Sequence, residues 1–343
     1  MKVLVYYKPN RKFDNFEGTR MRKCIKGSLE LINVTYTDNP VDYYDVANLI
    51  SPEQDTKSAE IRDNGAPIVV SALYTEDDPT ASFIENKSRD NPSSLSSKGL
   101  KFLNKADMIL VPNESAKQFL IDNGVTCEQI YPCCPGVNLA RFDFSKQEEK
   151  EIFHRYYRED KNKKLVIAVG EYDGKMNGVS SFINAAKKCP NAVFYFIGRI
   201  TLKNSISMRF KKFLSTAPKN VRFVDVPPDD VYRSALINAD VFMIPGYKKA
   251  GVTSILEAMA ARTQIIARKS TIFDGFLEDG VTAHLAEFSE TIASLTRDYL
   301  DGKIKPTTTQ AYNFACEHSL NVFGEELNKY YQLAIRNKVN RRN

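Results

Sequence analysis

The sequence predicts an α/β protein made of two doubly wound units in tandem, each built around a parallel sheet. Short apolar runs alternate with helical stretches along the chain, as expected for parallel strands that are buried on both faces. The same pattern starts again after a charged stretch that begins near Lys146. The length of 343 residues also favours two domains, since a domain commonly holds about 100–200 residues.

Apolar runs in the first half predict five strands, which are Lys2–Tyr7, Val34–Thr37, Tyr44–Ile50, Pro67–Ser71 and Ala106–Pro112. We expect a glycine-containing loop at Phe16–Arg20 and a polar loop at Asn86–Lys98. The expected helices are Met21–Leu31, residues 57–64 and Glu114–Asn123, the last of which ends at Gly124.

The second half repeats this order of elements. Its predicted strands are Lys164–Gly170, Ala192–Gly198, Val221–Val224, Asp240–Pro245 and Gln264–Ala267. The expected helices are Lys146–Lys164, Val179–Lys188, Asp229–Ala239, Ser254–Ala261 and residues 311–335. We therefore place one Rossmann-like domain at residues 1–145 and a second at residues 146–310. Residues 311–343 are expected to form a helix that packs back across the domains and ends in a basic tail.

Several classes of protein are excluded by composition. No apolar run approaches the roughly 18 residues of a membrane span, and the apolar start of the chain is broken too soon for a signal peptide. Cys133 and Cys134 are adjacent, the other four cysteines are isolated and the three histidines lie far apart, so metal-ligand spacing is absent. We expect reduced thiols, no bound metal ion and a cytoplasmic protein.

Charge is divided unevenly along the chain. Residues 1–140 carry 16 basic and 19 acidic side chains, whereas residues 141–343 carry 32 basic and 23 acidic ones. A basic second half suits the binding of an anion, although a solvated, lysine-rich surface explains the charge equally well. Nucleic acid is not an expected partner, because the basic residues lack interleaved aromatic side chains on one element.

Three glycines follow or closely trail predicted strands, where a backbone N–H can approach a phosphate. They are Gly18, Gly170 and Gly198, and each could instead serve a tight turn. Neither Gly-x-Gly-x-x-Gly nor a Walker lysine loop occurs, so a phosphate site would combine single glycines with basic side chains. The candidates, all close after strand ends in the second half, are Lys175, Arg199, Lys248 and Lys249.

The most specific segment runs from Asp240 to Ala261. A strand enters a glycine-bearing loop, and the helix that follows places Glu257 in its first turns. This carboxylate can accept two hydrogen bonds from ribose hydroxyls, while the N-terminus of the helix faces phosphate. The alternative is a glutamate that is placed favourably in the field of the helix dipole.

The segment and its Leu256–Ala260 block resemble the nucleotide-sugar motif of retaining family 4 glycosyltransferases of the GT-B fold. Further stretches are similar to that family in order and spacing, namely Ala106–Ser115, Pro135–Phe142 and Glu278–Ala283. Within the family, the first half most resembles bacterial enzymes that glycosylate diacylglycerol, and the similar stretches are Gly18–Arg20, Thr37–Pro40 and Tyr44–Ala47.

The resemblance implies two Rossmann-like domains that face a central cleft. It implies transfer of a hexose from a nucleotide sugar, a UDP-hexose, to a cell-envelope acceptor such as a glycolipid, with no metal or other cofactor. The implied donor-binding residues are Gly170, Lys175, Gly198, Arg199, Gly251, Val252, Thr253 and Glu257. Glu257, Lys248 and Lys249 would be catalytic, and Gly18 and Arg20 would lie on the acceptor side.

Three positions depart from the family pattern. Lys249 stands where the family has a glutamate, only Lys175 could replace the usual diphosphate-binding Arg and Lys, and Ser71–Thr75 lacks the usual histidine. Either the lysines rebuild the phosphate site, or the chain is a catalytically degenerate relative that binds and regulates or scaffolds a partner glycosyltransferase. A homo-oligomer is a further expected assembly.

A lipid acceptor implies a protein that is peripheral on the inner face of the cell membrane. Lys203–Leu214 is basic and partly amphipathic, and could lie on anionic headgroups at about 1 kcal/mol per cation. The alternative is a surface helix that packs Ile206, Phe210 and Phe213 into the second domain. Ser96–Leu103 is a weaker candidate on the first domain.

Overall fold

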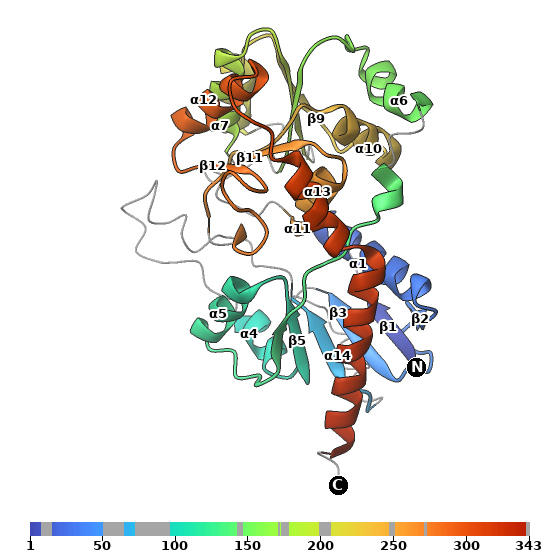
Figure 1. Cartoon of the computed structure of the whole chain (residues 1–343). Helices are drawn as coiled ribbons and strands as arrows, with labels where there is room; N and C mark the ends of the chain where they lie inside the picture. The colour runs from blue at the N-terminus through green and yellow to red at the C-terminus, as the bar shows by residue number, and fades with distance from the viewer. Residues whose placement is uncertain are drawn as a thin grey trace. The chain divides into compact units, whose positions relative to one another are not determined.

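A computed structural model of the chain describes residues 1–7, 16–50, 65–72, 97–142, 147–170, 172, 178–198, 207–246, 251–270 and 273–340. The chain divides into two compact units (Figure 1). The first unit contains residues 1–75, 91–138 and 317–343, and the second includes Leu139–Cys316. Each unit has its own sheet and its own apolar core.

The first unit contains a six-stranded sheet in which all neighbouring strands are parallel. The strands are β1 (Lys2–Tyr6), β2 (Thr35–Thr37), β3 (Val46–Ile50), β4 (Ile68–Ser71), β5 (Met108–Val111) and β6 (Ile130–Pro132). Their order is β2-β1-β3-β4-β5-β6, so the strand order reverses direction at β1 and β3. Ligands of doubly wound folds bind beyond the carboxyl ends of the strands at such a reversal.

Helices cover both faces of this sheet (Figure 1). They are α1 (Phe16–Leu31), α4 (Ser97–Leu103), α5 (Glu114–Asp122) and α14 (Leu320–Asn340). Side chains alternate along a strand, so Leu4 and Tyr6 pack with α4 and α5, whereas Val3 and Val5 pack with α1 and α14. This burial on both faces explains why the first strand is an almost unbroken apolar run.

The second unit also contains six parallel strands. They are β7 (Leu165–Val169), β8 (Val193–Ile197), β9 (Val221–Val224), β10 (Val241–Ile244), β11 (Gln264–Arg268) and β12 (His284–Ala286). The order β12-β11-β10-β7-β8-β9 is that of Rossmann folds, and the strand order reverses between β7 and β10.

Seven α-helices and one short 3₁₀ helix belong to the described part of the second unit. They are η1 (Leu139–Phe142), α6 (Gln147–Tyr157), α7 (Val179–Lys188), α9 (Met208–Thr216), α10 (Asp229–Asn238), α11 (Val252–Ala260), α12 (Ser289–Leu300) and α13 (Thr308–Glu317). The central strands β7, β8, β10 and β11 are buried along most of their length. The unit therefore has the layered core that the apolar runs predicted.

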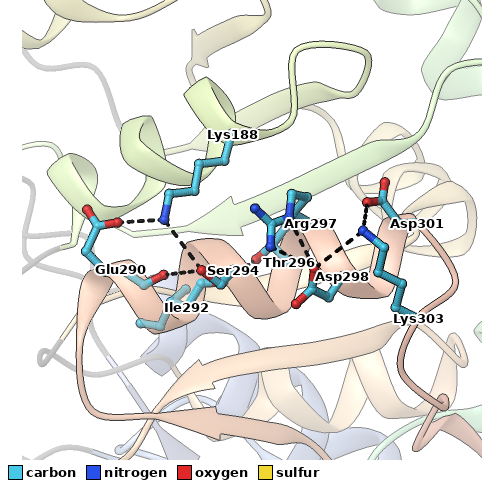
Figure 2. Close-up of polar contacts among 9 residues, drawn as sticks. All are labelled: Lys188, Glu290, Ile292, Ser294, Thr296, Arg297, Asp298, Asp301 and Lys303. Carbon is cyan, nitrogen blue, oxygen red and sulfur yellow. Dashed lines mark hydrogen bonds and ion pairs between the residues drawn. The ribbon is translucent and has the colours of Figure 1, made fainter.

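Helices α7 and α12 pack against each other on one face of this sheet. Figure 2 shows Lys188 of α7 reaching two residues of α12, with its Nζ 2.6 Å from Glu290 Oε2 and 3.5 Å from Ser294 Oγ. Exposed ion pairs contribute only about 0–1 kcal/mol each. Apolar burial, with Phe182 and Ile292 both fully inaccessible, therefore holds the two helices together.

The expected single helix over residues 311–335 is wrong, because α13 ends at Glu317 and α14 begins at Leu320. Between them, Ser319 forms an isolated bridge with Val137. The Val137 N–H donates to the His318 carbonyl oxygen at 2.8 Å, and the Leu320 N–H donates to the Val137 carbonyl oxygen at 3.1 Å. Pairing with a segment far away in the sequence therefore interrupts the helix.

The expected loop at Phe16–Arg20 is also wrong. Helix α1 begins at Phe16, so Gly18 and Arg20 lie in its first turns. The pattern did not predict β6, β12 or α12; the two strands have only three residues each. The expected helix at residues 57–64 and most of the expected loop at Asn86–Lys98 lie outside the described residues.

Helices α1 and α14 approach each other closely at Gly324, and a substitution there tests this contact. A Cβ atom at Gly324 would lie 2.6 Å from the Ser28 carbonyl oxygen and 3.1 Å from its carbon. Because backbone must shift to make room, we expect Gly324→Ala to lower the free energy of unfolding by about 1–3 kcal/mol, measured by denaturant unfolding.

The matched control is Gly27→Ala on the same helix pair. A Cβ atom at Gly27 would meet only Leu320 Cδ1, at 3.2 Å, which is the end of a side chain that can move. The higher helix propensity of alanine, worth about 1 kcal/mol, should offset this contact. Equal losses of stability in the two variants would contradict the close backbone approach at Gly324.

Candidate functional site

The carboxyl ends of β7 and β8 are packed together through two glycines. A Cβ atom at Gly198 would lie only 2.1 Å from the Gly170 carbonyl oxygen, so a side chain does not fit there. The Gly170 N–H donates to the Ile197 oxygen and the Gly198 N–H donates to the Val224 oxygen, both at 3.0 Å. These two amides are thus engaged within the sheet. We attribute Gly198 to close backbone packing, whereas a Cβ atom at Gly170 would meet only the Phe196 ring, at 3.3 Å. Contact of either glycine with a donor stays a prediction.

Tyr172 fills the space beside this glycine contact. Its side chain is fully buried among the rings of Phe196, Phe210 and Phe223, whose centroids lie 4.9–5.8 Å away. Its hydroxyl donates to the Phe196 carbonyl oxygen at 2.8 Å. Burial raises the pKa of Tyr172 well above its ordinary value, so the hydroxyl stays protonated. Burial and this hydrogen bond therefore fix the position of Tyr172, three residues after the end of β7.

Helix α7 begins against the end of β10, at the reversal of strand order. Gly178, the N-cap of α7, has a φ of 74°, and a Cβ atom there would lie 2.3 Å from the Pro245 carbonyl carbon and 2.4 Å from the Gly246 nitrogen. Glycine is required for both reasons. Because α7 begins here, the positive end of its dipole lies at this edge of the sheet, and Gly178 makes no side-chain hydrogen bond to its first turn. The sequence pattern missed this residue, whose signal is a glycine directly before a helix.

Helix α11 begins at the same edge, after the chain leaves β10. Its N-cap is Gly251, with no side-chain cap, and Val252 and Thr253 form its first turn. Thr253 is buried, and Glu257 is half-buried in the second turn. The second unit therefore brings Gly251, Val252, Thr253 and Glu257 onto one helix that starts beside the reversal of strand order.

Arg268, at the end of β11, is a buried residue that sequence reasoning missed. Its side chain is 1% exposed. Nε donates to the Pro245 carbonyl oxygen at 3.1 Å, and Nη1 donates to the Glu287 carbonyl oxygen. Nη2 donates to Ser181 Oγ at 3.1 Å and to Ser289 Oγ at 3.0 Å. The detectable signal is an arginine placed directly after an apolar strand at the carboxyl edge of the sheet.

The four basic residues of the predicted phosphate site, Lys175, Arg199, Lys248 and Lys249, lie outside the described residues. Lys175 belongs to the segment between β7 and α7, and Lys248 and Lys249 belong to the segment between β10 and α11. Their convergence on a phosphate therefore stays a prediction.

The predicted acceptor-side residues belong to the first unit. Gly18, in the first turn of α1, lies against Tyr7, and a Cβ atom there would be 2.4 Å from the Tyr7 ring. Arg20, two residues further along α1, is half-buried. Glycine at position 18 therefore allows the Tyr7 ring to lie against the start of α1, beyond the carboxyl end of β1.

Basic side chains of α1 meet an aspartate next to β2. Arg22 Nη2 is 2.9 Å and Lys26 Nζ is 2.7 Å from Asp38 Oδ2. Partial burial alone would raise the pKa of Asp38, but the hydrogen bonds from Lys26 and Arg22 outweigh it and the pKa lies below its ordinary value. Because Asp38 remains ionised, it neutralises part of the positive charge of α1.

Helix α9 has one buried face and one exposed, basic face. Phe210 is buried and Phe213 packs against the apolar core of the second unit, which favours the packing alternative for these two side chains. Lys211 and Lys212 are exposed, and Met208 is 86% exposed. Among the described residues, the structure contains no helix with the length and low charge needed to cross a membrane.

The cysteines form no disulfide, and within the described ranges no three His, Cys, Asp or Glu side chains are grouped as metal ligands would be. Cys133 is buried against α14 in the first unit. Burial raises the pKa of its thiol well above the ordinary value, and the nearby Glu326 carboxylate adds to this shift. The Cys133 thiol is therefore protonated at neutral pH.

The chain is similar to known proteins along its whole length. Residues 149–313 match the family model of group 1 glycosyl transferases. The processive diacylglycerol alpha-glucosyltransferase of Acholeplasma laidlawii is 24% identical over 350 residues, which cover 98% of this chain and 100% of the relative. The alpha-galactosylglucosyldiacylglycerol synthase of Streptococcus pneumoniae (strain ATCC BAA-255 / R6) is 23% identical over 222 residues, or 64% of this chain and 59% of the relative.

A solved structure has the same fold. Alr3699/HepE of Anabaena, in complex with UDP and glucose, superposes with a TM-score of 0.70 at 13% sequence identity. The superposition covers 97% of this chain and 99% of that chain. At this identity the likeness shows the architecture alone.

The glycine contact between β7 and β8 can be tested by substitution. Gly198→Ala would place a methyl group on the Gly170 carbonyl oxygen, which lies in backbone that cannot easily move. We expect a loss of about 2–4 kcal/mol in the free energy of unfolding, measured by denaturant titration.

Gly302→Ala serves as the control in the same unit. Gly302 has a φ of 73° but no atom within 4 Å of the added Cβ, so only the left-handed backbone conformation is penalised, by about 1–2 kcal/mol. If Gly198→Ala proves no more harmful than Gly302→Ala, the two strand ends are not in steric contact.

Proposed function

We propose that this chain, a GT-B glycosyltransferase whose residues 149–313 form a group 1 glycosyl transferase domain, moves a hexose from a UDP-hexose to a glycolipid acceptor with retention of configuration. The predicted fold class and the family resemblance are confirmed by that family match and by the fold of Alr3699/HepE. One observation carries the proposal: α7 and α11 both begin at the carboxyl edge of the sheet where the strand order reverses.

Donor binding is proposed to depend on this edge. A nucleotide diphosphate is the leaving group, and its developing negative charge must be stabilised by cations and by amide N–H groups. The first turns of α7 and α11 carry the positive ends of the helix dipoles, and the N-caps Gly178 and Gly251 make no side-chain hydrogen bond to these turns. Lys175, Lys248 and Lys249 would add charge from the preceding segments. We expect charge stabilisation of this kind to proceed without a metal ion.

The proposed reaction exchanges one bond at the hexose anomeric carbon for another. The bond from this carbon to the diphosphate oxygen breaks, and a bond to the acceptor hydroxyl oxygen forms on the same face of the sugar. The acceptor proton passes to the departing diphosphate. The transition state resembles an oxocarbenium ion, as in glycoside hydrolysis, and no enzyme nucleophile is required. Glu257 is assigned to the ribose hydroxyls.

The acceptor assignment rests on the relatives. The Acholeplasma laidlawii enzyme is named for diacylglycerol as its substrate. The match to it covers 98% of this chain. This match extends over the first unit as well as the second, so the acceptor side is included. Gly18 and Arg20, at the start of α1 beyond the carboxyl end of β1, are proposed to lie on that side.

A glycolipid acceptor requires the protein to work at a membrane surface. We assign this contact to the exposed face of α9, where Lys211 and Lys212 accompany the apolar side chains of Met208 and Leu214. Cations near an anionic surface contribute about 1 kcal/mol each. The apolar side chains add a smaller, non-ionic part of the binding.

Replacement of Glu257 tests the donor site. Glu257→Gln keeps the shape of the side chain but removes the charge that strengthens its hydrogen bonds to ribose, worth roughly 1.5–3 kcal/mol. We expect kcat/KM to fall about 10- to 100-fold. The assay follows transfer from radiolabelled UDP-glucose and UDP-galactose to diacylglycerol and to glucosyldiacylglycerol in vesicles.

Glu290→Gln on α12 is the matched control, since this exposed carboxylate forms a surface ion pair with Lys188 and should leave kcat/KM within about twofold. Equal activity of Glu257→Gln and the wild type would remove Glu257 from the site. Absence of both transfer and UDP binding in the wild type would instead favour the degenerate relative that binds a partner transferase.

The membrane contact of α9 is tested by removing its charge. The double variant Lys211→Gln/Lys212→Gln should lose about 2 kcal/mol of binding to phosphatidylglycerol vesicles, or roughly 30-fold in the partition constant. Vesicle sedimentation at low salt measures this change. Lys161→Gln/Lys163→Gln, in an exposed turn before β7, removes the same charge and should bind as the wild type. Equal effects of the two pairs would show that only net charge matters.

A further inference from the structure

Arg268 connects four segments of the second unit through one side chain. Its guanidinium donates to the end of β10 at Pro245, to the segment before α12 at Glu287, and to Ser181 in α7 and Ser289 in α12. Guanidinium presents five N–H donors in a rigid plane, whereas a lysine ammonium presents three around one point. The separate directions of these bonds therefore require arginine.

Two of these partners flank the place where α7 meets β10. Pro245 contributes the backbone against which Gly178 lies, with 2.3 Å from the Pro245 carbonyl carbon to a Cβ atom built on Gly178. Ser181 is three residues further along α7 and is 5% exposed. Arg268 thus binds both sides of the contact that places the N-terminus of α7 beside the end of β10.

Ser289 of α12 bonds to both Arg268 and Ser181. Ser289 is the first residue of α12, and its Oγ lies 2.6 Å from Ser181 Oγ. Because Arg268 is itself part of β11, which pairs with β10, its backbone and its side chain constrain the same strand end. Loss of the guanidinium would free the Pro245 carbonyl and α7 to move relative to each other.

We infer that Arg268 is a positioning residue for the donor. This inference rests on the proposed function and deepens it: the residue touches no substrate, but holds the start of α7 against Pro245 at the end of β10, in the arrangement that a nucleoside diphosphate needs. Small displacements of binding groups cost reaction rate steeply, about 100-fold for a shift near 1 Å.

The experiment compares UDP affinity and steady-state kinetics in matched variants. Arg268→Lys keeps the positive charge but loses the planar set of N–H donors. We expect the Kd for UDP and the KM for UDP-hexose to rise about 10-fold, and kcat/KM to fall about 10- to 100-fold. Ser181→Ala removes one acceptor on α7 and should raise the Kd for UDP in the same direction while leaving Arg268 in place.

Gln264→Met controls for loss of a buried polar group on the same strand. Gln264 is 1% exposed at the opposite end of β11, where it bonds to Thr307. This variant should be less stable to heat but should bind UDP with the wild-type Kd.

Each outcome has a distinct meaning. If Arg268→Lys and Ser181→Ala lower only the melting temperature and bind UDP like Gln264→Met, Arg268 is structural and the inference fails while the proposed function stands. If the wild-type protein itself binds no UDP, the proposed function and the inference fail together. A raised Kd for UDP in Arg268→Lys and Ser181→Ala, with an unchanged Kd in Gln264→Met, supports the positioning role.

Discussion

Backbone packed directly on backbone at the carboxyl edge of the second sheet determines where every described candidate donor group can lie. Gly198 lies against the Gly170 carbonyl and Gly178 against Pro245, in spaces that admit no Cβ atom. Glycine at these positions therefore lets backbone lie directly against backbone, and α7 begins in contact with the end of β10. Dipoles held in this way require little reorganisation when negative charge develops beside them, which is the main physical advantage of a preorganised site.

Apolar packing between α7 and β8 supports the carboxyl edge of the second sheet. Phe182 of α7 contacts the rings of Phe194 and Phe196 on β8 edge-to-face, with centroids 5.3 and 5.4 Å away. Tyr172 and Arg268 then connect the apolar core to polar backbone atoms at the strand ends. Steric exclusion sets the closest approach of the strand ends, and buried hydrogen bonds set their direction.

The architecture could be predicted from sequence because buried parallel strands are nearly continuous apolar runs, as Leu165–Val169 and Val193–Ile197 show. Glu257 and the start of α11 were also visible, since a strand, a glycine loop and a helix follow one another. Gly178 and Arg268 were missed because their importance lies in contacts with Pro245, 67 and 23 residues away in the chain. The break before Leu320 was hidden for the same reason, since Val137 causes it.

The place of α14 has a consequence for how the protein is made. Its side chains Phe323, Leu327 and Tyr331 cover the same face of the first sheet as Val3 and Val5. Until the ribosome has released the last turns of α14, α1 alone of the described helices covers that apolar face, although its strands are synthesised earlier. The second unit, which includes Leu139–Cys316, is complete in the nascent chain before the first unit can close its core. Synthesis therefore leaves β1 dependent on a helix that is made more than 300 residues later, and a chain that stops before α14 exposes apolar side chains that favour aggregation.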